Sequence, residues 1–220
     1  MTQQAPALEI ETAPSPDAAV LGLHGLGADG HDFEPVVPQL GLPPQLRVRF
    51  VFPHAPVRPV TLNMGMRMRA WYDILQLGGG REDEAGIRES QALLETLIAR
   101  ERRRGVAAQR IVLAGFSQGG AVALHTGLRH AERLAGILAL STYLPLAARL
   151  APEHSAANLG VPLFMAHGRF DDIIPIERAR QSRVALEGLG CKVEWREYAM
   201  PHAVCGEEIA DIAAWLRGVL

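Results

Sequence analysis

The segment at residues 115–120 has the pattern of residue types that points most directly to chemistry, since it reads Gly-Phe-Ser-Gln-Gly-Gly. An apolar run at 111–114 precedes it, and a helical segment of small residues follows from Ala121. A G-x-S-x-G sequence between a strand and a helix is typical of a nucleophile elbow, a sharp turn that presents a serine hydroxyl. The same sequence also occurs in ordinary strand-to-helix turns. The motif therefore predicts a nucleophilic Ser117 only if the chain also supplies a base for it.

A serine hydroxyl becomes a good nucleophile when a histidine accepts its proton and a carboxylate orients that histidine. In α/β-hydrolases the carboxylate and then the histidine follow the serine in the chain. Asp171 follows the apolar run at 161–166, and of the eight histidines only His202 comes after Asp171. This order predicts a triad of Ser117, Asp171 and His202. Asp172 is the alternative carboxylate, but Asp171 is nearer the strand end, and we expect Asp172 to cap the next helix.

A glycine-rich loop early in the chain is expected to help stabilise the negative charge that develops on an attacked acyl carbonyl. The loop reads Gly-Leu-Gly-Ala-Asp-Gly at 25–30 and follows the apolar run at 18–23. Its glycines allow the backbone to pass close to a bound acyl group with an N–H pointing inward. A nucleotide-phosphate site is the alternative use of such a loop, but the lysine of a Walker sequence is absent.

Strand-like and helical patterns alternate along the chain. The clearest helix begins near Asp83 and ends at Gly105, a second covers about 176–189, and a third closes the chain. This alternation predicts an α/β fold with a mostly parallel central sheet and helices on both faces. We expect a single domain over residues 1–220. The strand-like runs are 8–12, 18–23, 47–52, 110–114, 134–140, 161–166 and 192–198.

Composition excludes several classes of protein. A net charge of −2 gives no reason to expect nucleic acid as a partner, and we expect the basic cluster at 100–104 to be a solvated helix end. The two cysteines, Cys191 and Cys205, do not form a disulfide framework, and residues 1–6 lack the features of a signal peptide. The most apolar stretch, 134–148, is too short to cross a bilayer. These features predict a cytoplasmic protein with reduced thiols and no stable membrane insertion.

Several segments together resemble the bacterial carboxylesterase and acyl-protein thioesterase (lysophospholipase-like) family of α/β-hydrolases. The resemblance places the triad on Ser117, Asp171 and His202, and the oxyanion hole on the backbone N–H groups of Leu26 and Gln118. It implies no metal and no cofactor, a small-molecule acyl ester or thioester as substrate, and a homodimer as one possible assembly. The matching segments are 23–30, 52–56, 71–74, 114–121, 139–143, 168–175, and His202 followed by 207–209.

The chain departs from the family's usual sequence at two places. His54 stands where the family usually has glutamine, and the segment 63–70, which we expect to be a loop near the acyl group, contains three methionines and two arginines. Methionines often only fill gaps in a core, but here they also suit a flexible acyl channel, and the arginines favour short to medium acyl chains. The apolar side chains expected to bind the acyl group are Trp71, Ile173, Met66 and Met68.

Residues and resemblance together predict a serine carboxylic-ester hydrolase that cleaves short- to medium-chain acyl esters through an acyl-enzyme. An acyl-protein thioesterase or a lysophospholipase with the same triad is the alternative, because only the leaving group differs. A catalytically idle α/β-hydrolase that acts as a binding module is the alternative from another class. Such a protein would usually lack a triad or oxyanion element, and the sequence contains all of them.

Overall fold

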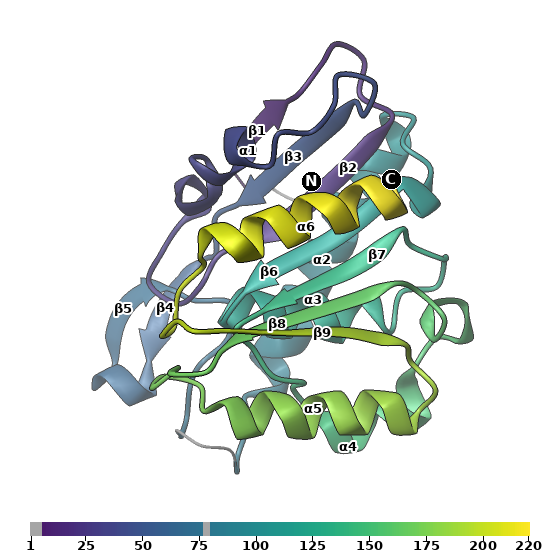
Figure 1. The fold of residues 1–220 in the computed structure, drawn as a ribbon. Helices are drawn as coiled ribbons and strands as arrows, with labels where there is room; N and C mark the ends of the chain where they lie inside the picture. The colour runs from purple at the N-terminus through teal and green to yellow at the C-terminus, as the bar shows by residue number, and fades with distance from the viewer. Residues whose placement is uncertain (1–5, 77–79) are drawn as a thin grey trace.

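A seven-stranded sheet forms the centre of the protein (Figure 1). The structure is a computed structural model that describes residues 6–76 and 80–220. The strands of this sheet are β1 (Ala7–Glu11), β2 (Ala18–Leu23), β3 (Val48–Pro53), β6 (Ile111–Phe116), β7 (Gly136–Leu140), β8 (Leu163–Gly168) and β9 (Val193–Tyr198). Their spatial order is β1-β3-β2-β6-β7-β8-β9, with β1 antiparallel to β3 and every other neighbouring pair parallel.

Helices cover both faces of the sheet. The helices are α1 (Val36–Gln39), α2 (Glu84–Arg103), α3 (Gln118–Gly127), α4 (Ala147–Glu153), α5 (Ile176–Gly188) and α6 (Gly206–Val219). The buried residues of α2, α3, α4 and α5 share one core cluster, whereas α1 and α6 pack into a second cluster on the opposite face. Figure 1 shows α6 in front of the sheet and α2 and α3 behind it. The described part of the chain also contains short 3-10 helices, η1 (Gly30–Phe33), η2 (Thr61–Asn63), η3 (Ala108–Arg110) and η4 (Ala156–Asn158).

The predicted α/β fold with a mostly parallel sheet is confirmed, and so are all seven predicted strands and all three predicted helices, with small differences at their ends. The strands β2, β3, β7 and β8 are buried at every position. A parallel sheet with helices on both faces has no solvent side, so its strands appear in the sequence as continuous apolar runs. The parallel arrangement also places the carboxyl ends of β2, β6, β8 and β9 along one edge, where the predicted site residues lie.

The basic cluster at 100–104 lies at the end of α2, and Arg102, Arg103 and Arg104 are exposed as expected, but its one acidic residue is buried. Glu101 has no exposed surface, and its carboxylate pairs with Arg49 of β3 at 2.7 Å and with Arg104 at 3.0 Å. Arg104 also pairs with Glu9 of β1 at 2.9 Å. A buried carboxylate is tolerated when cations neutralise it. The cluster therefore joins the end of α2 to the β1–β3 edge of the sheet.

The segment 64–69 is not a loop, as the sequence suggested, but forms part of a β-hairpin. Strand β4 (Val57–Val60) pairs antiparallel with β5 (Met66–Arg69). The connection contains η2 and Met64, whose backbone is left-handed at φ 54°. Strands of four residues are too short for their apolar and polar alternation to be distinguished from a loop.

Features that bear on the cellular setting are few. Cys191 and Cys205 are both free. Residues 1–5, which the signal-peptide expectation concerns, lie outside the described residues. Across 6–76 and 80–220, none of the helices has both the length and the apolar character needed to cross a membrane.

Gly119, at the start of α3, is predicted to tolerate no side chain. A Cβ there would lie 2.1 Å from the carbonyl oxygen of Leu23, a backbone atom that cannot move without shifting β2. We expect Gly119→Ala to lower the free energy of unfolding by about 2–3 kcal/mol, measured by urea denaturation. Gly218→Ala in α6 is the matched control, because nothing lies within 4 Å of its added Cβ. Equal stability of the two variants would contradict this account of the packing.

Candidate active site

Ser117 lies in a sharp turn between β6 and α3. Its backbone has φ 55° and ψ −121°, a conformation that residues with a side chain rarely adopt. Strain of this kind costs about 1–3 kcal/mol and concentrates at functional sites. The turn predicted from the G-x-S-x-G motif is therefore present, and it holds Ser117 at the carboxyl end of a central strand.

The surroundings of the turn enforce its conformation. A Cβ on Gly115 would lie 2.3 Å from the backbone of Gly119, so the strand and helix can approach this closely only with glycine at these positions. The backbone N–H of Ser117 donates to the carbonyl oxygen of Leu140 at 2.8 Å. The Thr142 hydroxyl donates to the Ser117 carbonyl oxygen at 2.6 Å. The end of β7 and the residues after it therefore hold the peptide groups on both sides of Ser117.

Asp171 and His202 meet at the same edge of the sheet, in the loops after β8 and β9. Nδ1 of His202 lies 2.7 Å from Oδ2 of Asp171. Oδ1 of Asp171 accepts the backbone N–H groups of Ile173 at 2.9 Å and Ile174 at 2.8 Å, which fixes the orientation of the carboxylate. A carboxylate can only accept, so Nδ1 of His202 carries the proton in this pair. Nε2 of the neutral ring then keeps a lone pair that can accept a proton.

The two loops are joined through their backbones, a feature that the sequence did not reveal. The N–H of Arg169 donates to the carbonyl oxygen of Tyr198 at 2.8 Å, and the N–H of Phe170 donates to that of Met200 at 3.1 Å. Gly168 allows this approach, since a Cβ there would lie 2.3 Å from the carbonyl oxygen of Pro201. The separation between Asp171 and His202 is thus set by backbone contacts on both sides. The glycine of the 168–175 segment was the available signal.

His167 is a further group at this carboxylate. It is fully buried at the end of β8, and its Nε2 lies 2.8 Å from the carbonyl oxygen of Ile174. The same nitrogen is 3.2 Å from Oδ2 of Asp171. Burial lowers the pKa of His167 below its ordinary value, so the ring is neutral near pH 7. His167 therefore acts as a neutral donor that supports the loop.

The expectation that Asp172 caps the next helix is wrong. Helix α5 begins after Pro175, and no side chain caps its first turn. The Asp172 side chain is exposed, whereas Asp171 is 8% exposed. Of the two adjacent carboxylates, the structure pairs Asp171 with His202.

The imidazole of His202 lies beside the serine turn. Its ring centroid is 4.7 Å from that of Phe116, which directly precedes Ser117. The hydrogen bonds found among the described residues do not include one between Ser117 and His202. In enzymes without bound substrate such a contact is often long, and it shortens when substrate binds.

The glycine-rich loop reaches the serine as predicted from its composition. A Cβ on Gly25 would lie 3.5 Å from the Cβ of Ser117, so this loop is in contact with the turn. Leu26 follows directly, and Gln118 is the first residue of α3, where backbone N–H groups have no partner within the helix. The spacing of the glycines at 25, 27 and 30 also fits a dinucleotide fingerprint. The loop, however, leads into the four-residue η1 and not into a long helix that could receive a pyrophosphate.

Trp71 has a different place from the one expected. It has no exposed surface, and its indole N–H donates to the carbonyl oxygen of His24 at 2.8 Å. The Gln118 side chain accepts the backbone N–H of Trp71 at 2.8 Å and donates to the carbonyl oxygen of Tyr72 at 2.7 Å. The hydrogen bonds of Trp71 and Gln118 therefore connect the glycine-rich loop to the serine turn. Because Trp71 is fully buried, a substrate cannot contact it.

Three other apolar residues predicted to bind the acyl group are accessible. Met68 is half-buried on β5, and its sulfur would lie 4.0 Å from a Cβ added to Gly27 in the glycine-rich loop. Met66, two residues earlier and hence on the same side of the strand, is 61% exposed. Ile173, in the loop of Asp171, is 55% exposed.

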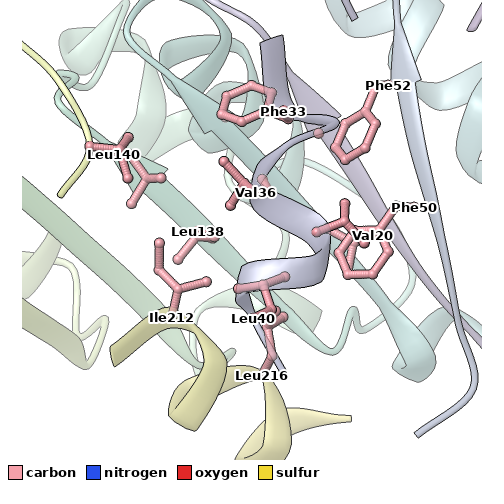
Figure 2. Close-up of a pocket in the computed structure, with 15 residues that line it drawn as sticks. Val20, Phe33, Val36, Leu40, Phe50, Phe52, Leu138, Leu140, Ile212 and Leu216 are labelled. Atoms are coloured by element: carbon pink, nitrogen blue, oxygen red, sulfur yellow. The ribbon is translucent and has the colours of Figure 1, made fainter. Parts of the chain in front are cut away.

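An apolar cavity of about 60 Å³ lies elsewhere, between α1, α6 and the sheet (Figure 2). Its lining includes Phe33, Val36, Leu138, Ile212 and Leu216, and none of the residues that line it has an ionisable side chain. The cavity therefore offers no group for acid–base chemistry and forms part of the packing on this face.

One side-chain group in residues 6–76 and 80–220, made up of Asp29, His31 and His54, has the spacing to hold a metal ion. Asp29 and His31 lie at the C-terminal end of the glycine-rich loop, and His54 directly follows β3. Burial and the nearby Arg69 lower the pKa of His54, so its ring is neutral near pH 7.

Comparison with known proteins agrees with this geometry. The family described as Phospholipase/Carboxylesterase matches residues 6–220. Acyl-protein thioesterase 1 of Gibberella zeae is 41% identical over 220 residues, which cover 96% of this chain and 94% of that protein. This relative is fungal, so the resemblance holds for the family but not for a specifically bacterial group.

Solved structures give the same result. The crystal structure of Zea mays acyl-protein thioesterase 2 has a TM-score of 0.87 at 26% identity, covering 97% of this chain and 98% of that one. The crystal structure of esterase PE8 has a TM-score of 0.83 at 26% identity, covering 99% of both chains. The chain belongs to the phospholipase/carboxylesterase family of α/β-hydrolases.

Proposed function

We propose that the protein hydrolyses acyl esters and thioesters through a covalent acyl-enzyme on Ser117. The observation that carries the proposal is the 2.7 Å contact between His202 and Asp171 at the edge of the sheet where Ser117 occupies its strained turn. A nucleophile, a base and an orienting carboxylate are the groups that acyl transfer needs.

The reaction follows from the protonation states of these groups. Nε2 of His202 accepts the Ser117 hydroxyl proton as Oγ attacks the acyl carbon, and Asp171 stabilises the imidazolium. The bond to the leaving group then breaks, and His202 gives its proton to the departing alcohol or thiol. Water attacks the acyl-enzyme, again giving a proton to His202. That proton returns to Ser117 as the carboxylic acid leaves.

The oxyanion of each tetrahedral intermediate needs fixed donors, for which we propose the backbone N–H groups of Leu26 and Gln118. The contact of Gly25 with Ser117 supports the first, and the position of Gln118 at the start of α3 supports the second. The hydrogen bonds from the Gln118 side chain to the Trp71–Tyr72 backbone hold the turn in place. Donors held in advance of the reaction stabilise developing charge most effectively.

Both kinds of leaving group have support. Relatives named acyl-protein thioesterase favour a thioester, and the likeness to esterase PE8 favours an oxygen ester. The triad chemistry is the same for both, because His202 protonates either an alkoxide or a thiolate. An idle binding module has no comparable support, since the residues of the triad are present and Asp171 and His202 are paired.

The function is tested by measuring hydrolysis of p-nitrophenyl esters from acetyl to octanoyl beside an acyl thioester and a lysophospholipid. We expect turnover of esters and of the thioester by the wild-type chain, and loss of both in Ser117→Ala. Retained turnover in Ser117→Ala would contradict the acyl-enzyme, and absence of turnover on every substrate would favour a binding module.

The carboxylate assignment is tested by Asp171→Asn. The Asn oxygen would keep accepting from Ile173 and Ile174, so the amide NH₂ would face His202 and force the proton onto Nε2. In that tautomer the ring cannot accept the serine proton, and we expect kcat to fall by about 10⁴-fold. Asp172→Asn is the matched control and should change kcat by less than about threefold, because its side chain is exposed. Greater sensitivity at Asp172 would contradict the assignment.

We further propose that Met66, Met68 and Ile173 form the apolar surface for the acyl chain. Each buried methylene adds up to about 0.8 kcal/mol of binding, so kcat/KM should rise with chain length and stop at a definite length. Met68→Ala should lower kcat/KM for octanoyl esters by about tenfold and leave acetyl esters nearly unchanged. Met64→Ala is the control, because Met64 is 93% exposed at the hairpin turn. An equal effect of Met68→Ala on both esters would contradict the proposal and indicate that Met68 only packs within the hairpin.

A further inference from the structure

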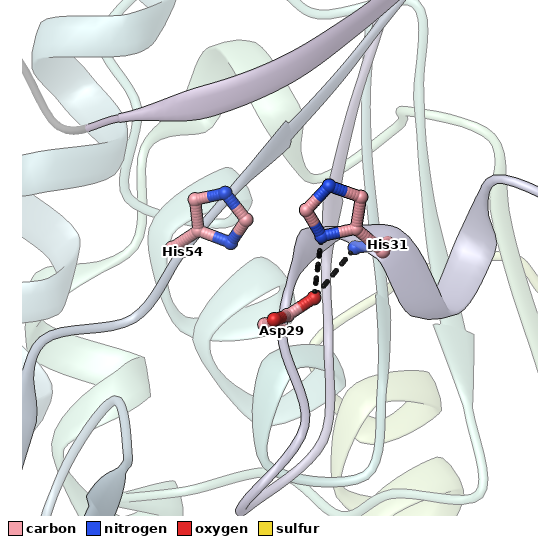
Figure 3. A group of neighbouring side chains, drawn as sticks. All are labelled: Asp29, His31 and His54. Atoms are coloured by element: carbon pink, nitrogen blue, oxygen red, sulfur yellow. Dashed lines mark hydrogen bonds and ion pairs between the residues drawn. The ribbon is translucent and has the colours of Figure 1, made fainter.

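Asp29, His31 and His54 form a group of potential metal ligands beside the glycine-rich loop (Figure 3). One ligand atom from each residue lies within 4.8 Å of the other two. Nδ1 of His31 is 2.9 Å from Oδ1 of Asp29. The His31 and Asp29 side chains are 60% and 40% exposed, so an ion from solvent can reach them.

The backbone brings these ligands together from two separate segments. Asp29 is the N-cap of η1 and accepts the backbone N–H of His31 at 2.9 Å. His54 directly follows β3, and its Nδ1 accepts the N–H of Gly30 at 3.0 Å. Gly30 is held against the end of β3, because a Cβ on it would lie 2.3 Å from the carbonyl oxygen of Phe52. The three side chains are therefore close in space because of the packing of the loop on the strand.

We propose that Asp29, His31 and His54 bind a divalent transition-metal ion of the zinc class. Two imidazoles and one carboxylate are ligands that Zn²⁺ accepts, with metal–ligand distances of about 2.0–2.2 Å. Tetrahedral ligands of such an ion lie about 3.3–3.6 Å apart, so the hydrogen-bonded pair of His31 and Asp29, now 2.9 Å apart, needs to open by only about half an ångström to admit the ion. Hard ions such as Mg²⁺ and Ca²⁺ prefer oxygen ligands and fit this group poorly.

Proton and hydrogen-bond changes limit the affinity. The Nδ1 proton that His31 shares with Asp29 leaves to solvent when the ion takes its place. His54 must stop accepting from Gly30, whether it binds through Nδ1 or through Nε2 with the ring proton moved to Nδ1. Because this hydrogen bond is lost when the ion binds, we expect the site to have a lower affinity for zinc than a structural zinc site. Ion binding is thereby coupled to the loop that contains Leu26.

The site is tested by titrating the untagged full chain with Zn²⁺ at pH 7 against a chromophoric chelator, and with Co²⁺ to read ligand-field absorption. We expect one ion per chain. His31→Asn and His54→Gln should each raise the dissociation constant for Zn²⁺ by about tenfold or more. Even the loss of a residue that only supports a metal ligand lowers metal affinity by about 10–100-fold. The His54→Gln amide can still accept from Gly30, so the loop keeps its contact, and thermal unfolding checks that each variant is folded.

Two control variants test whether the ion binds at histidines outside the proposed site. His154→Asn removes a histidine in a different part of the chain, whose Nδ1 donates to the carbonyl oxygen of Ala151 at 2.8 Å. His202→Ala removes the histidine paired with Asp171. Both variants should bind zinc as the wild type does. The proposal is overturned if the wild type binds no ion, if His31→Asn and His54→Gln keep wild-type affinity, or if His202→Ala loses the ion. None of these readouts requires hydrolytic activity.

Discussion

The backbone of Ser117 is held at a positive φ of 55° by its neighbours, and the arrangement of the site depends on this constraint. Without Gly115 and Gly119, β6 and α3 could not approach closely enough to form the turn. The contacts to Leu140 and Thr142 fix the peptide groups on either side. The strain is tolerated because the surrounding sheet and helix are buried and closely packed. One local conformation thus places Ser117 between the carboxyl end of β6 and the first residue of α3.

The sheet topology brings the loops of Asp171 and His202 and the glycine-rich loop to the same edge as Ser117. Parallel strands end at one edge, so loops that are far apart in the sequence meet there. Backbone hydrogen bonds between 169–170 and 198–200 fix the loops of Asp171 and His202 relative to each other. The glycine-rich loop is tied to the same turn through Trp71, whose indole binds the His24 carbonyl oxygen. The loops that contain the proposed catalytic groups are therefore positioned mainly by contacts to backbone atoms.

Much of this was predictable from sequence because the signals are local. The central strands were identified from continuous apolar runs, and Asp171 and His202 from their order after Ser117. The burial of Trp71 was not predictable, since it depends on tertiary packing that no local pattern encodes. The capping role expected of Asp172 was wrong because Pro175 takes the N-cap position of α5. The β4–β5 hairpin was missed because its strands are only four residues long. The site at Asp29, His31 and His54 joins segments whose proximity only the fold reveals.

The central claim is that Ser117 is an activated nucleophile, and labelling with a fluorophosphonate tests it most directly. Intact-mass analysis of the folded wild-type chain should show one phosphonyl adduct, and peptide mapping should place it on Ser117. His202→Ala should label far more slowly, because the hydroxyl then has no base. An adduct on another residue, or no adduct on the folded wild-type chain, would contradict the account.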